Sequence, residues 1–94
     1  MTSASSRDRL RDASAALGQR IRTSREALGI TQEELAHRSG LSRNQVQNLE
    51  NNRNNTRDAK GLHGPANPRL DTMWSVAAVL QISLSDLFED FDEF

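Results

Sequence analysis

The sequence predicts an all-α protein, a compact domain of five helices, and two kinds of observation support this prediction. The first is a helix start signal, Thr31 followed three residues later by Glu34. The same signal recurs at Ser42 and Gln45. In such a capping box, a Ser or Thr side chain and a Glu or Gln side chain each bond a backbone N–H of the first helical turn. The second observation is apolar residues recurring at helical steps along much of the chain.

The first expected helix covers residues 14–28. Apolar residues recur from Leu10 onward at steps of three, four and seven residues, and they comprise Leu10, Ala13, Leu17, Ile21 and Leu28. Gly29 follows directly, and glycine suits the left-handed position that ends many helices. Residues 1–13 form either a flexible N-terminal arm or an extension of this helix, and the sequence leaves both open.

Two short helices are expected next, at about 32–39 and 43–51. Gly40 stands between them, where a tight turn requires a left-handed residue. Each start signal is flanked by an apolar pair at the spacing of a hydrophobic staple, namely Ile30 with Leu35 and Leu41 with Val46. These independent cues agree, and together they predict a helix-turn-helix.

Two further helices are expected after a polar loop at 51–69. Asn67 as the cap and Pro68 at the first helical position start the fourth helix. Its expected buried stripe comprises Leu70, Met73, Val76, Ala77 and Leu80, and Trp74 lies beside it as a core or interface residue. A short fifth helix is capped by Ser83 with Asp86. Its apolar residues, which are expected to close the core, are Leu84, Leu87 and Phe88.

The segment 31–50 also carries a characteristic order of residues, which comprises Gln32, Leu35-Ala36, Gly40, Ser42 and Leu49-Glu50. In this pattern the chain resembles the lambda-repressor-like (Cro/CI, XRE) family of DNA-binding domains, over roughly residues 17–87. The resemblance implies the family's fold, with the third helix in the major groove of double-stranded DNA. The chain departs from the family pattern at Ser39, where an apolar residue is common, and in the long loop after Glu50.

The third helix is expected to contact the base edges, which requires side chains that donate and accept hydrogen bonds. Amide side chains do both, and an Arg side chain matches the O6 and N7 atoms of guanine. The expected base-contacting residues are Arg43, Asn44, Gln45, Gln47 and Asn48. Of these, the resemblance places Arg43, Asn44 and Asn48 on base-contacting positions of the family.

Contacts to the DNA backbone are expected on both sides of the third helix, from Gln32, Ser42, Asn51, Asn52, Arg53, Arg57 and Lys60. Of these, the resemblance places Gln32, Asn51, Asn52 and Arg53 on backbone-contacting positions of the family. Gln32 starts a helix whose N–H groups suit a phosphate. The loop at 51–69 has four basic residues against Asp58 alone, so it either contacts phosphates or is a solvated insertion. The resemblance also implies a structural ion pair between Arg25 and Glu50, which holds the third helix against the first.

Composition limits the class of protein. The 94 residues are enough for one domain, and the net charge is −1, whereas nucleic-acid binders are usually basic. Five of the 13 acidic residues lie at 86–94, so the rest of the chain has 12 basic residues against eight acidic ones. The chain lacks cysteine and has no apolar run near the roughly 18 residues of a membrane span. We therefore expect a cytoplasmic protein without membrane contact.

Two functions from different classes fit these observations. The first is a sequence-specific transcription regulator, a repressor that binds double-stranded DNA as a homodimer through domain 14–88. The alternative is a protein-interaction module such as an antitoxin, in which the acidic tail at 89–94 binds a protein partner. The two histidines, His37 and His63, have no metal-site spacing, and no catalytic or cofactor motif is present. We therefore expect neither an enzyme nor a bound cofactor or metal.

Overall fold

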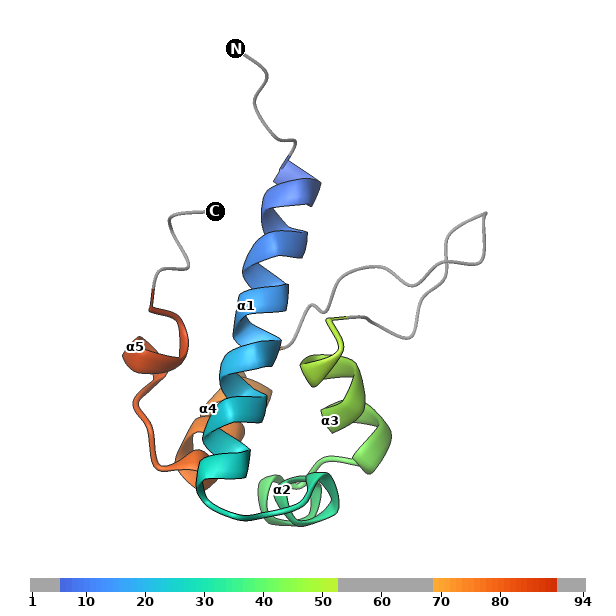
Figure 1. The fold of residues 1–94 in the computed structure, drawn as a ribbon, viewed down its shortest axis with the longest axis vertical. Helices are drawn as coiled ribbons and strands as arrows, with labels where there is room; N and C mark the ends of the chain where they lie inside the picture. The colour runs from blue at the N-terminus through green and yellow to red at the C-terminus, as the bar shows by residue number, and fades with distance from the viewer. Residues whose placement is uncertain (1–5, 53–68, 90–94) are drawn as a thin grey trace.

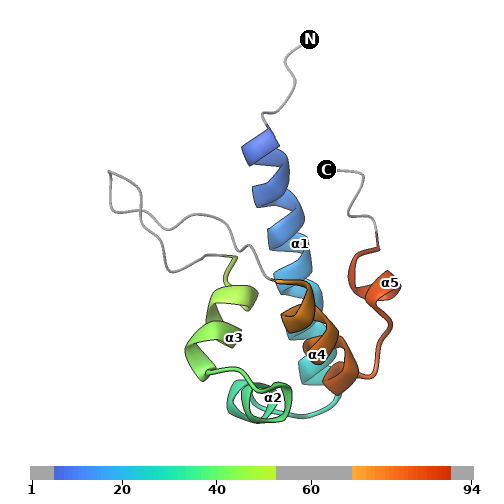
Figure 2. The same cartoon turned by 180° about the vertical axis from the view of Figure 1, so that it is seen from behind.

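The computed structural model describes residues 6–52 and 69–89 of the chain. In these two segments it contains helices and no strand, which confirms the all-α, five-helix prediction. The elements are α1 (Ser6–Ala27), α2 (Gln32–Ser39), α3 (Arg43–Glu50), α4 (Leu70–Leu80) and α5 (Leu84–Leu87). Figure 1 shows α1 as the long central helix, with α3 on one side of it and α5 on the other. The opposite view in Figure 2 shows α4 lying across α1.

Helix α1 starts at Ser6, so residues 6–13 extend the helix that was expected at 14–28. It ends at Ala27, and Gly29 adopts a φ of +69°. The N–H of Ile30 donates to the carbonyl of Arg25 at 3.3 Å, and the N–H of Gly29 donates to that of Glu26 at 3.0 Å. These two bonds form a Schellman motif, the helix end for which Gly29 is suited.

Both predicted capping boxes are present in α2 and α3. The hydroxyl of Thr31 accepts a bond from the N–H of Glu34, and that of Ser42 accepts one from the N–H of Gln45, each at 3.1 Å. Gly40 ends α2 with a φ of +74°. A Cβ added to Gly40 would meet no atom within 4 Å, so the position requires glycine for its backbone conformation alone.

The core lies between the five helices, which pack most extensively where α3 meets α1 and where α2 meets α3 and α4. Its fully buried side chains come from every helix, and the largest are Ile21, Leu35, Val46, Met73, Val76 and Leu87. The predicted stripe of α4 is buried at Met73, Val76, Ala77 and Leu80. Leu84 and Phe88 pack against the core while remaining partly exposed, as expected for residues that close it.

Helix α4 differs from the prediction at its start. Arg69 is the N-cap, with an extended backbone and no side-chain capping bond, so the predicted start at Asn67 and Pro68 is wrong. These two residues lie outside the described part of the chain. Leu70, predicted to be buried, is 72% exposed, and Trp74 one turn later is 67% exposed. Residues four apart share one face of a helix, and this face of α4 points away from the core.

Among the described helices, none combines the length and the apolar character that a membrane-spanning segment requires.

Candidate nucleic-acid interface

The first turn of α3 presents polar side chains to solvent. Arg43, Asn44 and Gln45 are exposed, and Gln47 is partly exposed. Val46 and Leu49 of the same helix point into the core. The helix therefore has the arrangement that base contact requires, with an anchored apolar side and an amino-terminal turn open to a groove.

Two of the expected base-contacting residues are less available than the sequence indicated. Asn48 is only 8% exposed, so its expected place on the open face of α3 is wrong. It follows the exposed Asn44 by one turn, so the amphipathic pattern of α3 did not distinguish the two positions. The side-chain carbonyl of Gln45 accepts a bond from the backbone N–H of Ser42 at 2.8 Å, as part of the capping box. A two-bond contact to adenine needs both the carbonyl and the amino group of an amide, so Gln45 has only its amino group left for a base.

A cluster of polar side chains surrounds the carboxylate of Glu50 at the end of α3. The side chain of Glu50 has no exposed area. Arg25 donates two bonds to it, from Nε at 2.8 Å and from Nη2 at 3.1 Å. Arg22 Nε and Gln32 Nε2 each donate to the same carboxylate at 3.2 Å. In this Glu50 cluster, defined by Arg22, Arg25, Gln32 and Glu50, donors from α1 and α2 therefore meet an acceptor from α3.

Electrostatics keep the Glu50 cluster charged. Burial by itself raises the pKa of Glu50, but the bonds from Arg25, Gln32 and Arg22 outweigh it and hold that pKa below its usual range. The bond to Glu50 likewise raises the pKa of Arg25. At neutral pH the carboxylate and the guanidinium groups of the cluster are therefore charged, and they hold three helices together at the carboxyl end of α3.

The residues expected to contact the DNA backbone already have partners inside the protein where the structure describes them. Gln32 donates to Glu50, and Ser42 caps α3. Asn51 Oδ1 accepts a bond from Arg22 at 3.0 Å, and Asn52 Nδ2 donates to the carbonyl of Arg11 at 2.9 Å. These bonds tie the end of α3 to α1. The remaining expected residues, Arg53, Arg57 and Lys60, lie outside the described part of the chain.

Gly18 is a structural residue that the sequence reasoning missed. A Cβ at this position would lie 2.4 Å from the carbonyl oxygen of Leu49 and 2.9 Å from that of Glu50. Gly18 therefore permits the close approach of α1 and α3, and Arg22 and Arg25 reach Glu50 from the following turns of α1. A usable signal was present, because a glycine inside a helical pattern costs about 1 kcal/mol relative to alanine and usually has a packing reason.

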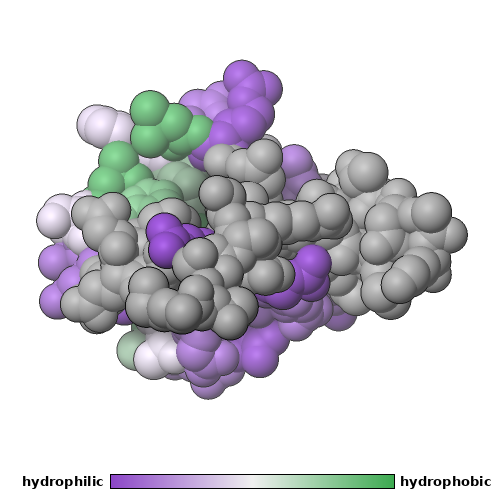
Figure 3. Space-filling view, turned by 90° about the horizontal axis from the view of Figure 1, so that it is seen from above, coloured by the Kyte–Doolittle hydropathy of each residue, from purple (hydrophilic) through white to green (hydrophobic). Residues whose placement is uncertain are grey.

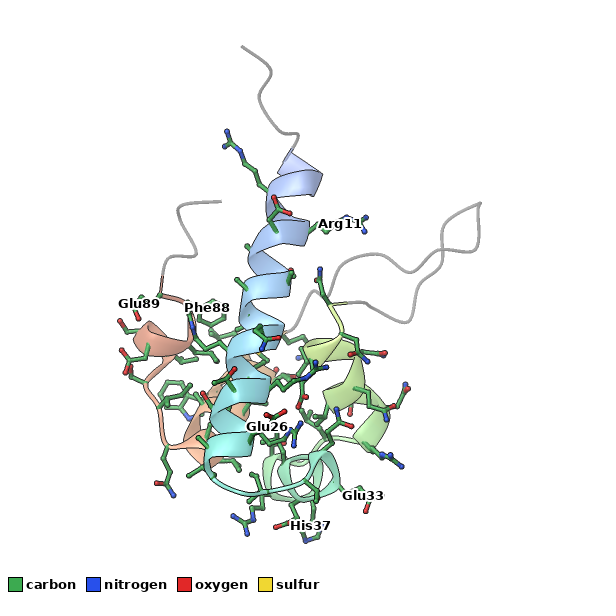
Figure 4. All side chains as sticks on the ribbon, viewed as in Figure 1. Arg11, Glu26, Glu33, His37, Phe88 and Glu89 are labelled. Atoms are coloured by element: carbon green, nitrogen blue, oxygen red, sulfur yellow. The ribbon has the colours of Figure 1, made fainter. Side chains whose placement is uncertain are left out.

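Arg43, the residue expected to contact guanine, lies beside a carboxylate of α2. Its Nη1 is 3.6 Å from Glu33 Oε1. Figure 4 labels Glu33 on α2, at the side of that helix where α3 begins.

Within residues 6–52 and 69–89, no group of His, Asp and Glu side chains is arranged to hold a metal ion.

Comparisons with known proteins agree with this geometry. Residues 21–60 match a family model described as helix-turn-helix. The chain is also similar to the crystal structure of the restriction-modification controller protein C.AhdI from Aeromonas hydrophila, with 33% sequence identity and a TM-score of 0.63. That match covers 80% of this chain and 96% of the controller protein. No curated protein sequence matches the chain. The chain belongs to the lambda-repressor-like (Cro/CI, XRE) helix-turn-helix family, and it is a DNA-binding transcription regulator.

Proposed function

We propose that this protein is a sequence-specific transcription regulator that binds its operator as a homodimer, with α3 in the major groove, and represses by occupying that site. The open amino-terminal turn of α3, fixed to α1 and α2 through the Glu50 cluster, is the observation that carries this proposal. A recognition helix with a fixed orientation presents the same side chains to every site, which sequence discrimination requires. Similarity to a restriction-modification controller protein supports a regulatory role.

The base contacts in this proposal come from the most exposed side chains of α3. Arg43 bonds the O6 and N7 atoms of guanine, and Asn44 and Gln47 contact neighbouring bases through their amides. Gln45 contributes through its amino group alone. Asn48 would have to leave its buried position to contact a base, so we place it outside the primary set. Contacts of Gln32, Ser42, Asn51 and Asn52 with phosphates remain predictions, as do those of the basic residues Arg53, Arg57 and Lys60.

The surface that we propose for dimerisation lies on α4 and α5. Leu70 and Trp74 protrude there, beside an apolar hollow lined by Trp74, Ala77, Ala78, Ile82, Ser83 and Leu84. Figure 3 shows hydrophobic surface gathered on one side of the molecule. Large exposed apolar patches mark interaction sites. A protruding side chain next to a hollow on the same face makes that face self-complementary, which a two-fold dimer requires.

Charges at the edge of this face also suit a second copy of the chain. Arg69 and Asp71 are 83% and 72% exposed and lie 3.5 Å apart, one on each side of Leu70. In a two-fold arrangement, each Arg69 can meet the partner's Asp71. When the same patch of two copies comes into contact, the positive charge of each copy therefore faces the negative charge of the other.

The dimer is tested by Trp74→Glu, measured by analytical ultracentrifugation with circular dichroism as the check on folding. We expect a folded monomer whose binding to a full operator is weakened, because only one half-site contact remains per molecule. Leu28→Glu is the matched control, since Leu28 is another large exposed apolar residue, at the end of α1. This control should remain dimeric, and a Trp74→Glu protein that stays dimeric would place the interface elsewhere.

DNA binding is tested by selecting bound sites from a random duplex library at near-physiological salt. A homodimeric regulator should enrich one two-fold symmetric site with half-sites about 34 Å apart. Weak, salt-sensitive binding without enrichment would contradict the proposal. It would favour the protein-interaction module instead, in which the tail at 89–94 binds a partner; residues 90–94 of that tail lie outside the described part of the chain.

A further inference from the structure

The two acidic residues in the first turn of α2 have different surroundings. Glu34 takes part in the capping box with Thr31 and also lies 3.6 Å from Arg38 of its own helix. Glu33 instead lies 3.6 Å from Arg43, across the turn between α2 and α3. Of this pair of carboxylates, Glu33 is therefore the one that faces the guanidinium expected to contact a base.

Glu33 and Arg43 border an open hollow between the starts of α2 and α3. The hollow measures about 400 Å³, and its lining comprises Arg25, Thr31, Gln32, Glu33 and Arg43. The side chains of Glu33 and Arg43 are 72% and 60% exposed. Exposed ion pairs contribute little or nothing to folding. Folding stability therefore gives little reason for this pair.

We propose that Glu33 is a positioning residue for Arg43, and that it makes the protein more specific by keeping Arg43 off the DNA phosphates and directing it to a guanine. This inference rests on the proposed function of α3. Glu33 acts here through its charge and need not touch DNA.

The physical basis is that the two acceptors open to Arg43 differ in charge. A phosphate that approaches Arg43 also approaches the carboxylate of Glu33, and the two negative charges repel each other. Guanine has no formal charge, and its O6 and N7 atoms carry only partial negative charges, so the repulsion from Glu33 is much weaker there. Glu33 thus disfavours the contact of Arg43 with a phosphate, which carries no sequence information. It leaves the contact with guanine, which does carry it.

The hydrogen-bonding capacity of Arg43 allows both interactions at once. A guanidinium has five N–H donors. With Nη1 directed to Glu33, the Nη2 and Nε groups remain for the two acceptors of guanine. The carboxylate also limits the rotation of the guanidinium plane. This helps a two-bond contact, because both bonds form only when that plane has a fixed orientation.

Removal of the Glu33 charge should therefore weaken discrimination rather than affinity. In Glu33→Gln we expect binding to a scrambled duplex to become tighter, with a steeper salt dependence that corresponds to about one more phosphate contact. Discrimination at a single guanine of each half-site should fall by about five- to tenfold, a part of what a two-bond base contact contributes. Glu33→Asp, which keeps the charge, should retain most of the discrimination.

The experiment measures the affinities of wild type, Glu33→Gln, Arg43→Gln and the double variant for the selected operator, for the operator with each base pair substituted, and for a scrambled duplex. Glu26→Gln is the matched control, because it removes the same charge from a side chain of α1 that is 63% exposed. If Glu33 acts through Arg43, its substitution loses its effect on discrimination in the Arg43→Gln background.

Three results would overturn the inference. Equal effects of Glu33→Gln and Glu26→Gln would show a general change in net charge. Loss of discrimination that persists without Arg43 would show that Glu33 contacts a base itself. Unchanged discrimination in Glu33→Gln, on a site that wild type selects, would refute the inference while the proposed function stands. If wild type selects no site at all, the proposed function fails instead.

Discussion

The two helix pairs of this domain, α2–α3 and α4–α5, are stabilised by different means. In α2–α3, each helix starts with a capping box and α2 ends at Gly40, so its turns are fixed by residues adjacent in sequence. In α4, the helix starts at Arg69 without a side-chain cap and ends with Gln81 in a left-handed conformation. The turns of the α2–α3 half are therefore fixed mainly by neighbouring residues. In the α4–α5 half, Ser83 caps α5 through the N–H of Asp86, but α4 has no such cap and depends on contacts with the rest of the fold.

Each half is also held to α1 by long-range polar contacts, with one main contact for each half. For α3 it is the buried Glu50 cluster. For α5 it is Arg20, whose Nη1 donates to the backbone carbonyls of Asp86, Leu87 and Glu89 at 3.3, 3.1 and 2.7 Å. A single turn such as α5 is not stable by itself, so this cation at its carboxyl end holds the segment in place.

Glu50→Gln should have the largest effect, a loss of about 3–5 kcal/mol in the free energy of unfolding, because it removes the buried carboxylate that pairs with the mostly buried Arg25. Urea unfolding measures this loss. Glu26→Gln is the matched control, since Glu26 also pairs with Arg25 but is 63% exposed, and it should cost less than about 1 kcal/mol. Similar small losses in both variants would mean that the cluster does not hold α3.

The pH dependence of unfolding provides a second test of the Glu50 cluster. The pKa of Glu50 is lowered by folding, so its contribution is fully present at neutral pH, above the unfolded pKa of about 4.3. It is lost as the pH falls below that value and through the lowered pKa of the folded state. Stability of wild type should therefore drop more steeply with acid than that of Glu50→Gln. Parallel curves would contradict the assigned ionisation.

Gly18→Ala should destabilise the protein by about 1–3 kcal/mol, because the added Cβ meets the backbone carbonyls of Leu49 and Glu50 and α3 must shift. The sign of the change is informative, since helix propensity alone predicts a gain of about 1 kcal/mol. Thermal unfolding of the variant measures it. A more stable Gly18→Ala protein would show that the close approach of α1 and α3 can relax freely.

Arg20→Met should cost about 1–2 kcal/mol, since it keeps most of the apolar stem but removes a charged donor to three carbonyls. Hydrogen exchange should show lost protection at α5 and little change at α3. Arg9→Met, a change at an exposed residue of the same helix, is the control. Equal loss of protection in α3 and α5 would show that the two halves of the domain are not independent.

The smallest effects concern two equivalent helix ends. Gln81→Gly should stabilise the protein by about 0.5–1 kcal/mol, because Gln81 has a φ of +61° that glycine adopts without strain. Gly40→Ala should destabilise it by about 1 kcal/mol, because alanine is strained in the left-handed conformation of Gly40. The added Cβ contacts nothing, so no clash adds to this cost. Differential scanning calorimetry of both variants checks the opposite signs. A loss in Gln81→Gly would mean that the Gln81 side chain has a stabilising contact.

The contrast between the halves also explains how far the sequence could predict the fold. The start signals, Gly40 and the bounds of α2 were predicted correctly because they follow from neighbouring residues. In α4, the local signal at Asn67 and Pro68 was wrong, and Leu70 was placed in the core. Periodicity gives the direction in which a side chain points, but it does not show where the neighbouring helices end.

At the candidate site, too, some features could be predicted from the sequence and others could not. The pairing of Arg25 with Glu50 was expected from the family resemblance, and the structure places the two side chains in contact. The additional donors Arg22 and Gln32 were not expected, because their reach depends on how closely α1 approaches α3 at Gly18. The burial of Asn48 was also missed, since exposure at the end of a short helix depends on what packs beside it.

Arg43→Ala is the sharpest test of whether the first turn of α3 contacts base edges. Its affinity is measured for the selected operator, for every single-base variant of that operator and for a scrambled duplex. We predict a loss of about 1–3 kcal/mol on the operator, together with loss of discrimination at one guanine of each half-site and unchanged discrimination elsewhere. An equal weakening on all duplexes would contradict such base contact, because it would show that Arg43 contacts only phosphate.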